Sequence, residues 1–293
     1  MMATSKTYTT AGAFRRAVEE RLKNLSQAKQ VDVNRLRRQV AFDRLLARLF
    51  QNDATPWALK GGYALELRFM AARSTIDIDL TLQRVVATAE AGDAVRAIRE
   101  MLQAAADASL DDWFQYTIGP PVMDLTAAPY GGARYSVETR MDGRVFAKFH
   151  LDAGIGDVVI QPLEIVECPD WLGFAGIKQP HVRMISREQQ YAEKIHAYTL
   201  PRSTPNSRVK DLVDLALLAG DNRLDRAMAF SALRLTFERR NTHPLPVSLS
   251  APPEEWQKPF QALAKECRLR TDIAAVFDHV RTFFGEVVAS GTK

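Results

Sequence analysis

Cysteine is scarce in this sequence: among 293 residues only Cys168 and Cys267 are cysteines, and they lie far apart. This spacing argues against a disulfide scaffold and a zinc finger, and it favours a reducing cytoplasm. No apolar run approaches the ~20 residues that a bilayer-spanning helix needs. Residues 1–10 also lack the apolar core of a secretory signal. We therefore expect a cytoplasmic protein with no membrane partner.

Neither sign of charge dominates the sequence. The 39 Lys and Arg residues against 35 Asp and Glu residues give a net charge of +4 and a pI of about 9.1. This mildly basic balance permits a nucleic-acid or nucleotide partner without demanding one. With 46% hydrophobic and 25% charged residues, the composition is that of a folded globular protein, and it excludes collagen-like and disordered classes.

Hydropathy patterns divide the chain into three predicted domains: N-terminal helices over 1–53, a mixed α/β domain over 54–183 and a helical domain over 184–293. In the first domain, apolar residues recur at helical spacing from Phe14 onward. The opposite helix face is basic, and ordinary solvation of that face is the expectation. Its residues are Arg35, Arg37, Arg38, Arg44 and Arg48. In the third domain, Ser186 and Gln189 are spaced as a capping box that opens a helix.

The sharpest feature of the sequence is a pair of acids on a predicted strand. Residues 74–82 alternate strictly, so Asp77 and Asp79 point to one face while Ile76, Ile78 and Leu80 anchor the other face in a core. Adjacent carboxylates repel unless a cation lies between them, and Mg²⁺ prefers such oxygen ligands. The alternative is a pair of solvated acids on an exposed strand face.

Two further features lie near this pair in the sequence or in the predicted sheet. Residues 137–152 are expected to form a β-hairpin around Asp142-Gly143, and strand parity places Asp152 on the same face as His150. Gly61 and Gly62 form a predicted strand-to-helix turn whose backbone could approach a phosphate. Three carboxylates on adjacent strands with such a turn are typical of a two-metal phosphoryl-transfer site. A plain tight turn and a hydrogen-bonded strand histidine are the alternative readings.

The motifs resemble those of the AbiEii-type nucleotidyltransferase toxins, within the DNA polymerase β-like superfamily. The similarity lies in Lys60-Gly61-Gly62-Tyr63-Ala64-Leu65-Glu66-Leu67, Arg73-Ser74-Thr75-Ile76-Asp77-Ile78-Asp79-Leu80, Glu193-Lys194-Ile195-His196-Ala197 and Arg208-Val209-Lys210-Asp211-Leu212-Val213-Asp214-Leu215. The order and spacing of these four motifs cover about residues 59–218. One departure is that Gly62 stands where the superfamily often has Ser, so the nearby hydroxyls are those of Ser74 and Thr75.

The resemblance implies an α+β fold, with a polymerase β-like nucleotidyltransferase core of mixed β-sheet and flanking helices and a C-terminal helical bundle. It implies that Asp77, Asp79 and Asp152 hold two Mg²⁺ ions, that Lys194 contacts the triphosphate and that Asp214 is an essential acid. Further nucleotide-binding positions are then Lys60, Gly61, Gly62, Ser74, Thr75, Lys194, Arg208, Lys210 and Asp211. From the residues alone, Lys194 could instead be a surface lysine and Lys210–Asp214 an ordinary surface ion pair.

The resemblance also implies the function: a toxin that moves NMP from an NTP to an RNA acceptor, expected to be a tRNA 3′ end, and that blocks translation. Its expected partners are NTP, tRNA and a separately encoded antitoxin. Two alternatives stay open at this point. One is nucleotidyl transfer to a protein hydroxyl or a small molecule, and the other is a non-catalytic regulator that binds nucleotide or RNA.

Overall fold

The computed structural model describes residues 8–52, 54–69, 72–83, 91–125, 128–202 and 208–291. The chain forms two compact units, and each is described by itself. The sheet unit comprises Met1–Leu59, Ser74–Gly156 and Ile165–Met184, and the helical unit comprises Lys60–Arg73, Asp157–Glu164 and Ile185–Lys293. The helical unit thus takes in two short segments of the predicted α/β domain. The boundaries after residues 53 and 183 stay a prediction.

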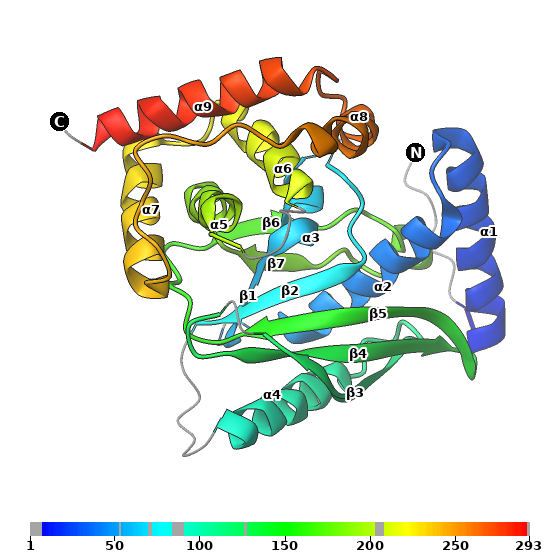
Figure 1. Ribbon diagram of the computed structural model, residues 1–293. Coiled ribbons are helices and arrows are strands. Elements are labelled where there is room, and N and C mark those ends of the chain that lie inside the picture. The colour runs from blue at the N-terminus through cyan, green and yellow to red at the C-terminus, as the bar shows by residue number, and fades with distance from the viewer. Residues whose placement is uncertain are drawn as a thin grey trace. The chain divides into compact units, whose positions relative to one another are not determined.

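The strands described by the structure form one mixed sheet in the spatial order β3-β4-β5-β2-β1-β7-β6 (Figure 1). They are β1 (Trp57–Lys60), β2 (Asp77–Leu82), β3 (Gln115–Asp124), β4 (Gly132–Met141), β5 (Arg144–Gly154), β6 (Glu164–Glu167) and β7 (His181–Met184). β3, β4 and β5 form an antiparallel meander, whereas β2 runs parallel to β5 and β1 parallel to β7. The predicted hairpin turn is present, since Asp142 and Gly143 both have positive φ, 54° and 68°.

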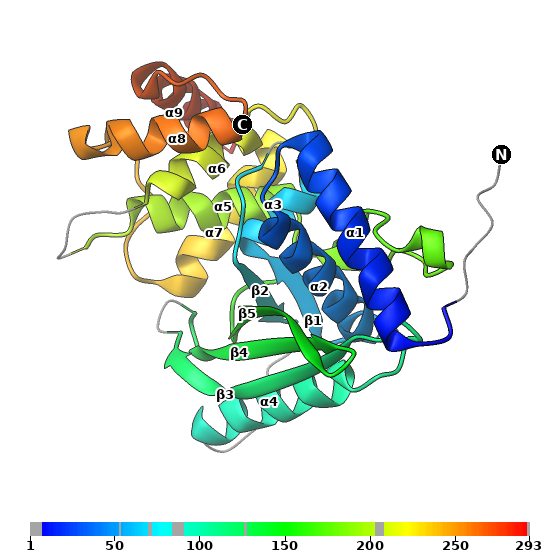
Figure 2. The same cartoon turned by 90° about the vertical axis from the view of Figure 1, so that its right-hand side faces the viewer.

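Helices cover one face of this sheet. The sheet unit contains α1 (Ala11–Lys29), α2 (Val33–Leu49) and α4 (Ala91–Ala106). In Figure 2, α4 runs beneath β3 and β4, while α1 lies beside α2. The Phe42 ring of α2 meets the Phe149 ring of β5 edge-on at 4.7 Å between centroids, and the Tyr116 hydroxyl of β3 donates to the Ala41 carbonyl. Side chains that alternate with Phe149 therefore point to the other face of the sheet.

The first two helices bury the apolar stripe that their spacing predicts, with Phe14 and Val40 among the buried residues. The expectation of a solvated basic face is wrong for two of its arginines. Arg48 Nη2 lies 2.6 Å from Asp112 Oδ1 and Arg44 Nε lies 2.6 Å from Asp112 Oδ2, with all three side chains buried. Asp112 lies 68 positions from Arg44 and 64 from Arg48 in the sequence, so the local pattern of α2 does not predict this ion pair.

The helical unit has its own hydrophobic core. Its α-helices in the described residues are α3 (Gly61–Arg68), α5 (Arg187–Thr199), α6 (Val209–Ala219), α7 (Arg226–Arg240), α8 (Gln257–Glu266) and α9 (Ile273–Ser290). α5 packs against α6 and α7, and α9 packs against the same two helices (Figure 1). Ser186 caps α5 as predicted, accepting a hydrogen bond from the Gln189 backbone N–H at 3.1 Å. The Gln189 side chain bonds instead to the backbone of Val158 and Ile160, so the second half of the predicted capping box does not form. The core between these helices includes Tyr191, Leu212 and Phe284.

These elements confirm the predicted fold class: an α+β protein with a mixed sheet, flanking helices and C-terminal helices. Across the described ranges, no helix is both long enough and apolar enough to cross a bilayer.

Candidate active site

The two acids of the predicted strand lie at the start of β2. Ile78 and Leu80 are fully buried in the core, so the alternating residues Asp77 and Asp79 lie on the opposite face and are half-buried. The expectation that Ile76 helps to anchor the strand is wrong, because β2 begins only at Asp77 and the Ile76 side chain is exposed. The rigid presentation of both carboxylates depends on the two core residues that follow.

The neighbouring strand adds the third acid. In the parallel pair of β2 and β5, Asp77 is aligned with His150 and Asp79 with Asp152. Aligned residues on adjacent strands have side chains on the same face of a sheet. The structure thus brings together the carboxylates of Asp77, Asp79 and Asp152, and we call this surface the acid face.

An arginine that the sequence analysis did not identify lies on the acid face. Arg134 of β4 is aligned with Asp152 in the antiparallel pair of β4 and β5. Its Nε donates to Asp152 Oδ1 at 2.7 Å, and its Nη2 donates to Asp152 Oδ2 at 2.8 Å and to Asp77 Oδ2 at 3.3 Å. The hydrogen bond to Asp152 is the main reason that the pKa of the Arg134 guanidinium is raised. A cation therefore already lies between two of the three acids.

One oxygen of the acid face has unused bonding capacity. Asp77 Oδ1 is buried and accepts no hydrogen bond, and His150 Nδ1 lies 3.6 Å from it. No three His, Cys, Asp or Glu side chains in the described ranges already converge as a metal cage. The donors present are nonetheless hard carboxylate oxygens, and the guanidinium of Arg134 bonds to two of these carboxylates. This donor set fits a divalent cation such as Mg²⁺.

The helical unit contains the glycine turn and the predicted basic residues. Gly61 has a φ of 67°, a left-handed conformation that favours glycine, and α3 begins there. Lys60, which precedes it, is half-buried, with its Nζ 2.5 Å from Asp157 Oδ2 and 3.1 Å from Glu193 Oε2. Burial alone would lower the pKa of Lys60, but the carboxylates of Glu193 and Asp157 outweigh burial and raise it. The ammonium of Lys60 is therefore already neutralised by protein groups.

A second ion network in the helical unit joins the two later motifs. Lys194 Nζ lies 2.6 Å from Asp214 Oδ2 and 2.9 Å from Asp211 Oδ1. Asp214 is fully buried and also accepts two hydrogen bonds from Arg73, at 2.9 and 2.8 Å. We call these four residues the Lys194 cluster. Burial acts to lower the pKa of Lys194, but Asp211 and Asp214 outweigh burial and raise it. Neither the surface-lysine reading nor a surface Lys210–Asp214 pair agrees with this geometry.

The other predicted binding residues occupy less constrained positions. Thr75 Oγ1 donates to the Asp77 carbonyl at 3.4 Å, and Ser74 beside it is half-buried. Arg208 Nη1 lies 3.3 Å from Asp211 Oδ2, whereas Lys210 is exposed. Gly62 is buried in the first turn of α3. The roles that the resemblance implies for these residues stay predictions.

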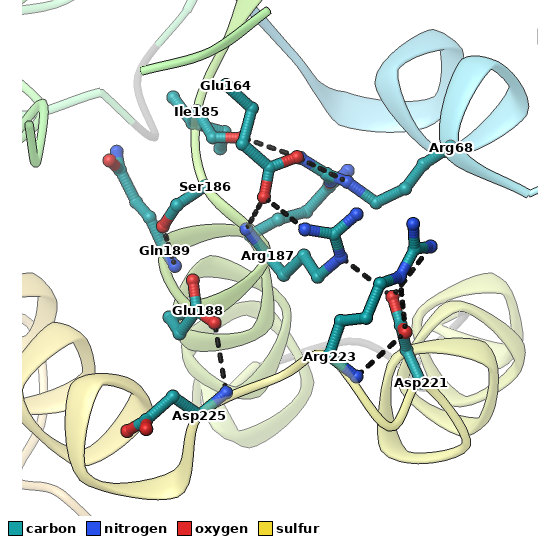
Figure 3. Close-up of polar contacts among 11 residues, drawn as sticks. Arg68, Glu164, Ile185, Ser186, Arg187, Glu188, Gln189, Asp221, Arg223 and Asp225 are labelled. Carbon is teal, nitrogen blue, oxygen red and sulfur yellow. Dashed lines mark hydrogen bonds and ion pairs between the residues drawn. The ribbon is translucent and has the colours of Figure 1, made fainter. Parts of the chain in front are cut away.

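A third network, which the sequence analysis also did not identify, holds α3 in place (Figure 3). Arg68, at the end of α3, pairs with Glu164 at 2.9 Å, and Glu164 in turn pairs with Arg187 of α5 at 2.7 Å. Arg68 also donates to the Gln190 side chain, whose Nε2 donates to the Gly61 carbonyl at 2.7 Å. The glycine turn and the helix that carries Lys194 are therefore tied together within the helical unit.

Carboxylates on adjacent strands of a mixed sheet are typical of the class of enzymes that bind divalent metal ions for phosphoryl transfer. Comparison with known proteins identifies the family. Residues 44–281 match the family described as nucleotidyl transferase AbiEii toxin, type IV TA system. The chain belongs to this family of nucleotidyltransferase toxins, whose partners are an NTP and an antitoxin.

Solved structures provide a comparison of fold. MenT4, a nucleotidyltransferase toxin from Mycobacterium tuberculosis H37Rv, is similar with a TM-score of 0.54 and 16% identity over 97% of this chain and 99% of that chain. JHP933 from Helicobacter pylori has a TM-score of 0.47 and 13% identity over 88% of this chain and 93% of that chain. The similarity to MenT4 is one of fold. A comparison with curated proteins gives no match.

Proposed function

We propose that this toxin transfers a nucleoside monophosphate from an NTP to a hydroxyl of an RNA acceptor, the 3′ end of a tRNA, and so blocks translation in the cytoplasm. The observation that carries this proposal is the alignment of Asp79 with Asp152 across β2 and β5, with Asp77 on the same face. Three carboxylates in that arrangement suit the attack of a hydroxyl on a phosphate held by divalent metal ions.

Asp77, Asp79 and Asp152 are the residues that would hold two Mg²⁺ ions. Bound there, Mg²⁺ would neutralise the phosphate oxygens and lower the pKa of the attacking hydroxyl. A carboxylate oxygen of Asp152 accepts the proton of the acceptor hydroxyl while the hydroxyl oxygen forms a bond to the α-phosphorus of the NTP. The bond from the α-phosphorus to the bridging β-phosphate oxygen breaks, and pyrophosphate leaves. Asp77 and Asp79 are fixed for this task by the buried strand residues between and after them.

Lys194 supplies the cation for the triphosphate in this proposal. Asp211 and Asp214 hold its ammonium at 2.9 and 2.6 Å, so its position is set before any substrate binds. A preorganised cation stabilises developing charge without a reorganisation cost at the moment of reaction. Arg73 balances the charge of Asp214, which makes Asp214 a positioning residue for Lys194.

Two observations support an acceptor with a polyanionic backbone. The chain is basic, with a net charge of +4. A cavity of about 550 Å³ beside Asp77 is lined by apolar side chains such as Ile76 and by polar ones that include His150 and Lys148. Such a cavity is large enough for one nucleotide, and Lys148 at its wall can meet a phosphate. His150 can hydrogen-bond an acceptor hydroxyl next to the acid face.

The test is to incubate the protein with each labelled NTP in turn, Mg²⁺ and total RNA. We expect label in RNA of tRNA length, and no label when Asp79→Asn replaces the wild type. Label in protein would instead support nucleotidyl transfer to a protein hydroxyl. Binding of NTP without any labelled product, under conditions in which the protein is folded, would contradict catalysis and favour a nucleotide-binding regulator.

A further inference from the structure

Arg134 makes a fork of hydrogen bonds on the acid face. Its two donors meet both oxygens of Asp152, at 2.7 and 2.8 Å, and one of them also reaches Asp77 at 3.3 Å. Charge-assisted bonds of this bidentate kind are stronger than ordinary hydrogen bonds. Both oxygens of Asp152 are thus engaged by the protein itself.

A structural role alone gives a poor account of this arrangement. β4 and β5 are already joined by a ladder of main-chain pairs from Gly132 to Met141. Arg134 lies on the face away from α2 and α4, and its side chain is 28% exposed, so it fills no core position. The charge of Arg134 explains its position better, since three carboxylates on adjacent strands repel one another in the absence of a cation.

We propose that Arg134 is a built-in counter-cation that competes with the divalent metal ion for Asp152 and Asp77. This inference rests on the proposed function, because it takes these acids to be the metal ligands. In the metal-free protein the guanidinium holds the carboxylates together. A metal ion at Asp152 would compete with the guanidinium for the same two oxygens, so a divalent cation alone binds weakly. Arg134 is then a positioning residue that delays metal loading until a substrate with phosphate oxygens can receive its guanidinium.

The test measures Mn²⁺ affinity without nucleotide, from the electron paramagnetic resonance signal of free Mn²⁺. We expect Arg134→Gln to tighten Mn²⁺ binding at least about tenfold, or ~1.4 kcal/mol. The matched control is Arg140→Gln on the same strand, which also removes one positive charge. Arg140 pairs at 2.6 Å with Glu138, outside the acid face. We expect this control to change Mn²⁺ affinity less than about twofold, because an exposed pair is screened by solvent.

Arg134→Lys covers the case in which Arg134→Gln does not fold. A lysine keeps the charge but loses the fork, so we expect a smaller gain in Mn²⁺ affinity. Equal Mn²⁺ affinity in wild type, Arg134→Gln and Arg134→Lys would overturn the inference, and so would weaker binding in either variant.

Adding Asp77→Asn to wild type and to Arg134→Gln separates this inference from the proposed function. If Asp77→Asn removes Mn²⁺ binding while the two arginine variants match wild type, the metal site stands and the role of Arg134 is wrong. If Asp77→Asn leaves Mn²⁺ binding unchanged, or if no protein binds Mn²⁺, both the proposed metal site and the role of Arg134 are wrong. Tighter binding in Arg134→Gln that Asp77→Asn abolishes supports both.

Discussion

The acid face and the Lys194 cluster are both groups of charged side chains, but they differ in balance and in burial. In the Lys194 cluster, the cations of Lys194 and Arg73 match the carboxylates of Asp211 and Asp214 in number, and Asp214 is fully buried. Arg208 adds a further ion pair with Asp211. On the acid face, the guanidinium of Arg134 lies among three carboxylates that keep some exposure. A buried cluster whose carboxylates are matched by cations needs no further cation. A partly exposed cluster in which one guanidinium is shared by two carboxylates can take a further cation.

The largest effect should come from removing one carboxylate of the acid face. We expect Asp77→Ala or Asp79→Ala to reduce nucleotidyl transfer by at least about a thousandfold, or ~4 kcal/mol. Thermal stability of the metal-free protein should stay near or above that of wild type, because repulsion is relieved. The measurement pairs a labelled-NTP transfer assay with a melting curve. Wild-type turnover in either variant would place the active site elsewhere.

In the Lys194 cluster the loss of one carboxylate should affect stability instead. Asp214→Ala removes the fully buried carboxylate that Lys194 and Arg73 share, so we expect unfolding free energy to fall by about 3–5 kcal/mol. Urea denaturation measures this loss. Asp77→Ala is the matched control, since it deletes the same group from the acid face. If Asp214→Ala and Asp77→Ala unfold at the same urea concentration, the contrast between the two regions is not real.

Lys194→Ala tests whether the buried cluster also serves catalysis. We expect a loss of about 2 kcal/mol in transition-state stabilisation, seen as a fall in kcat/KM, because a preorganised cation for phosphate is gone. Lys194→Arg should restore this only in part, since the guanidinium differs in reach and shape. An active Lys194→Ala enzyme with unchanged affinity for NTP would exclude contact between Lys194 and the triphosphate.

The smallest expected effect concerns a buried histidine in the helical unit. Burial, with the nearby Arg240 and His243 charges, lowers the pKa of His196 to about 3. The folded protein therefore stays unprotonated at His196 while the unfolded chain gains a proton below its ordinary pKa of about 6.5. Stability should thus fall by about 1–2 kcal/mol between about pH 7 and pH 5.

His196→Gln is the variant that isolates this pH dependence. Glutamine can keep the hydrogen bond that His196 Nε2 makes with Thr242 Oγ1 at 2.9 Å. We expect a flatter stability profile between about pH 7 and pH 5, because one proton uptake by the unfolded state is removed. Urea midpoints at both pH values measure it. If the stability of variant and wild type changes equally between the two pH values, His196 has the same protonation in the folded and unfolded states.

Local patterns in the sequence predict a large part of the fold and the acid face. Strict alternation places Asp77 and Asp79 on one strand face, strand parity adds Asp152, and the capping box marks the start of α5. Each of these patterns involves residues only a few positions apart, so each can be identified from the sequence without knowledge of tertiary contacts.

The ion pairs of the two charged regions depend on contacts between distant segments, which local patterns do not reveal. Arg73 and Asp214 are 141 positions apart, and Arg134 and Asp77 are 57 apart, so no local spacing relates them.

Two elements have weak patterns in their own sequence. β3 contains Gly119, Pro120 and Pro121, which obscure its strand pattern. α7 has charged and apolar residues around its whole circumference, so its sequence shows no clear helical period.

The central claim, that the acid face is a divalent-metal site for nucleotidyl transfer, is tested most directly by anomalous diffraction. Crystals of the protein with Mn²⁺ and a non-hydrolysable NTP analogue would be measured at the manganese edge. The account expects anomalous peaks among the carboxylates of Asp77, Asp79 and Asp152, with the α-phosphate of the analogue beside them. Peaks elsewhere, or bound nucleotide with no manganese at these three residues, would contradict it.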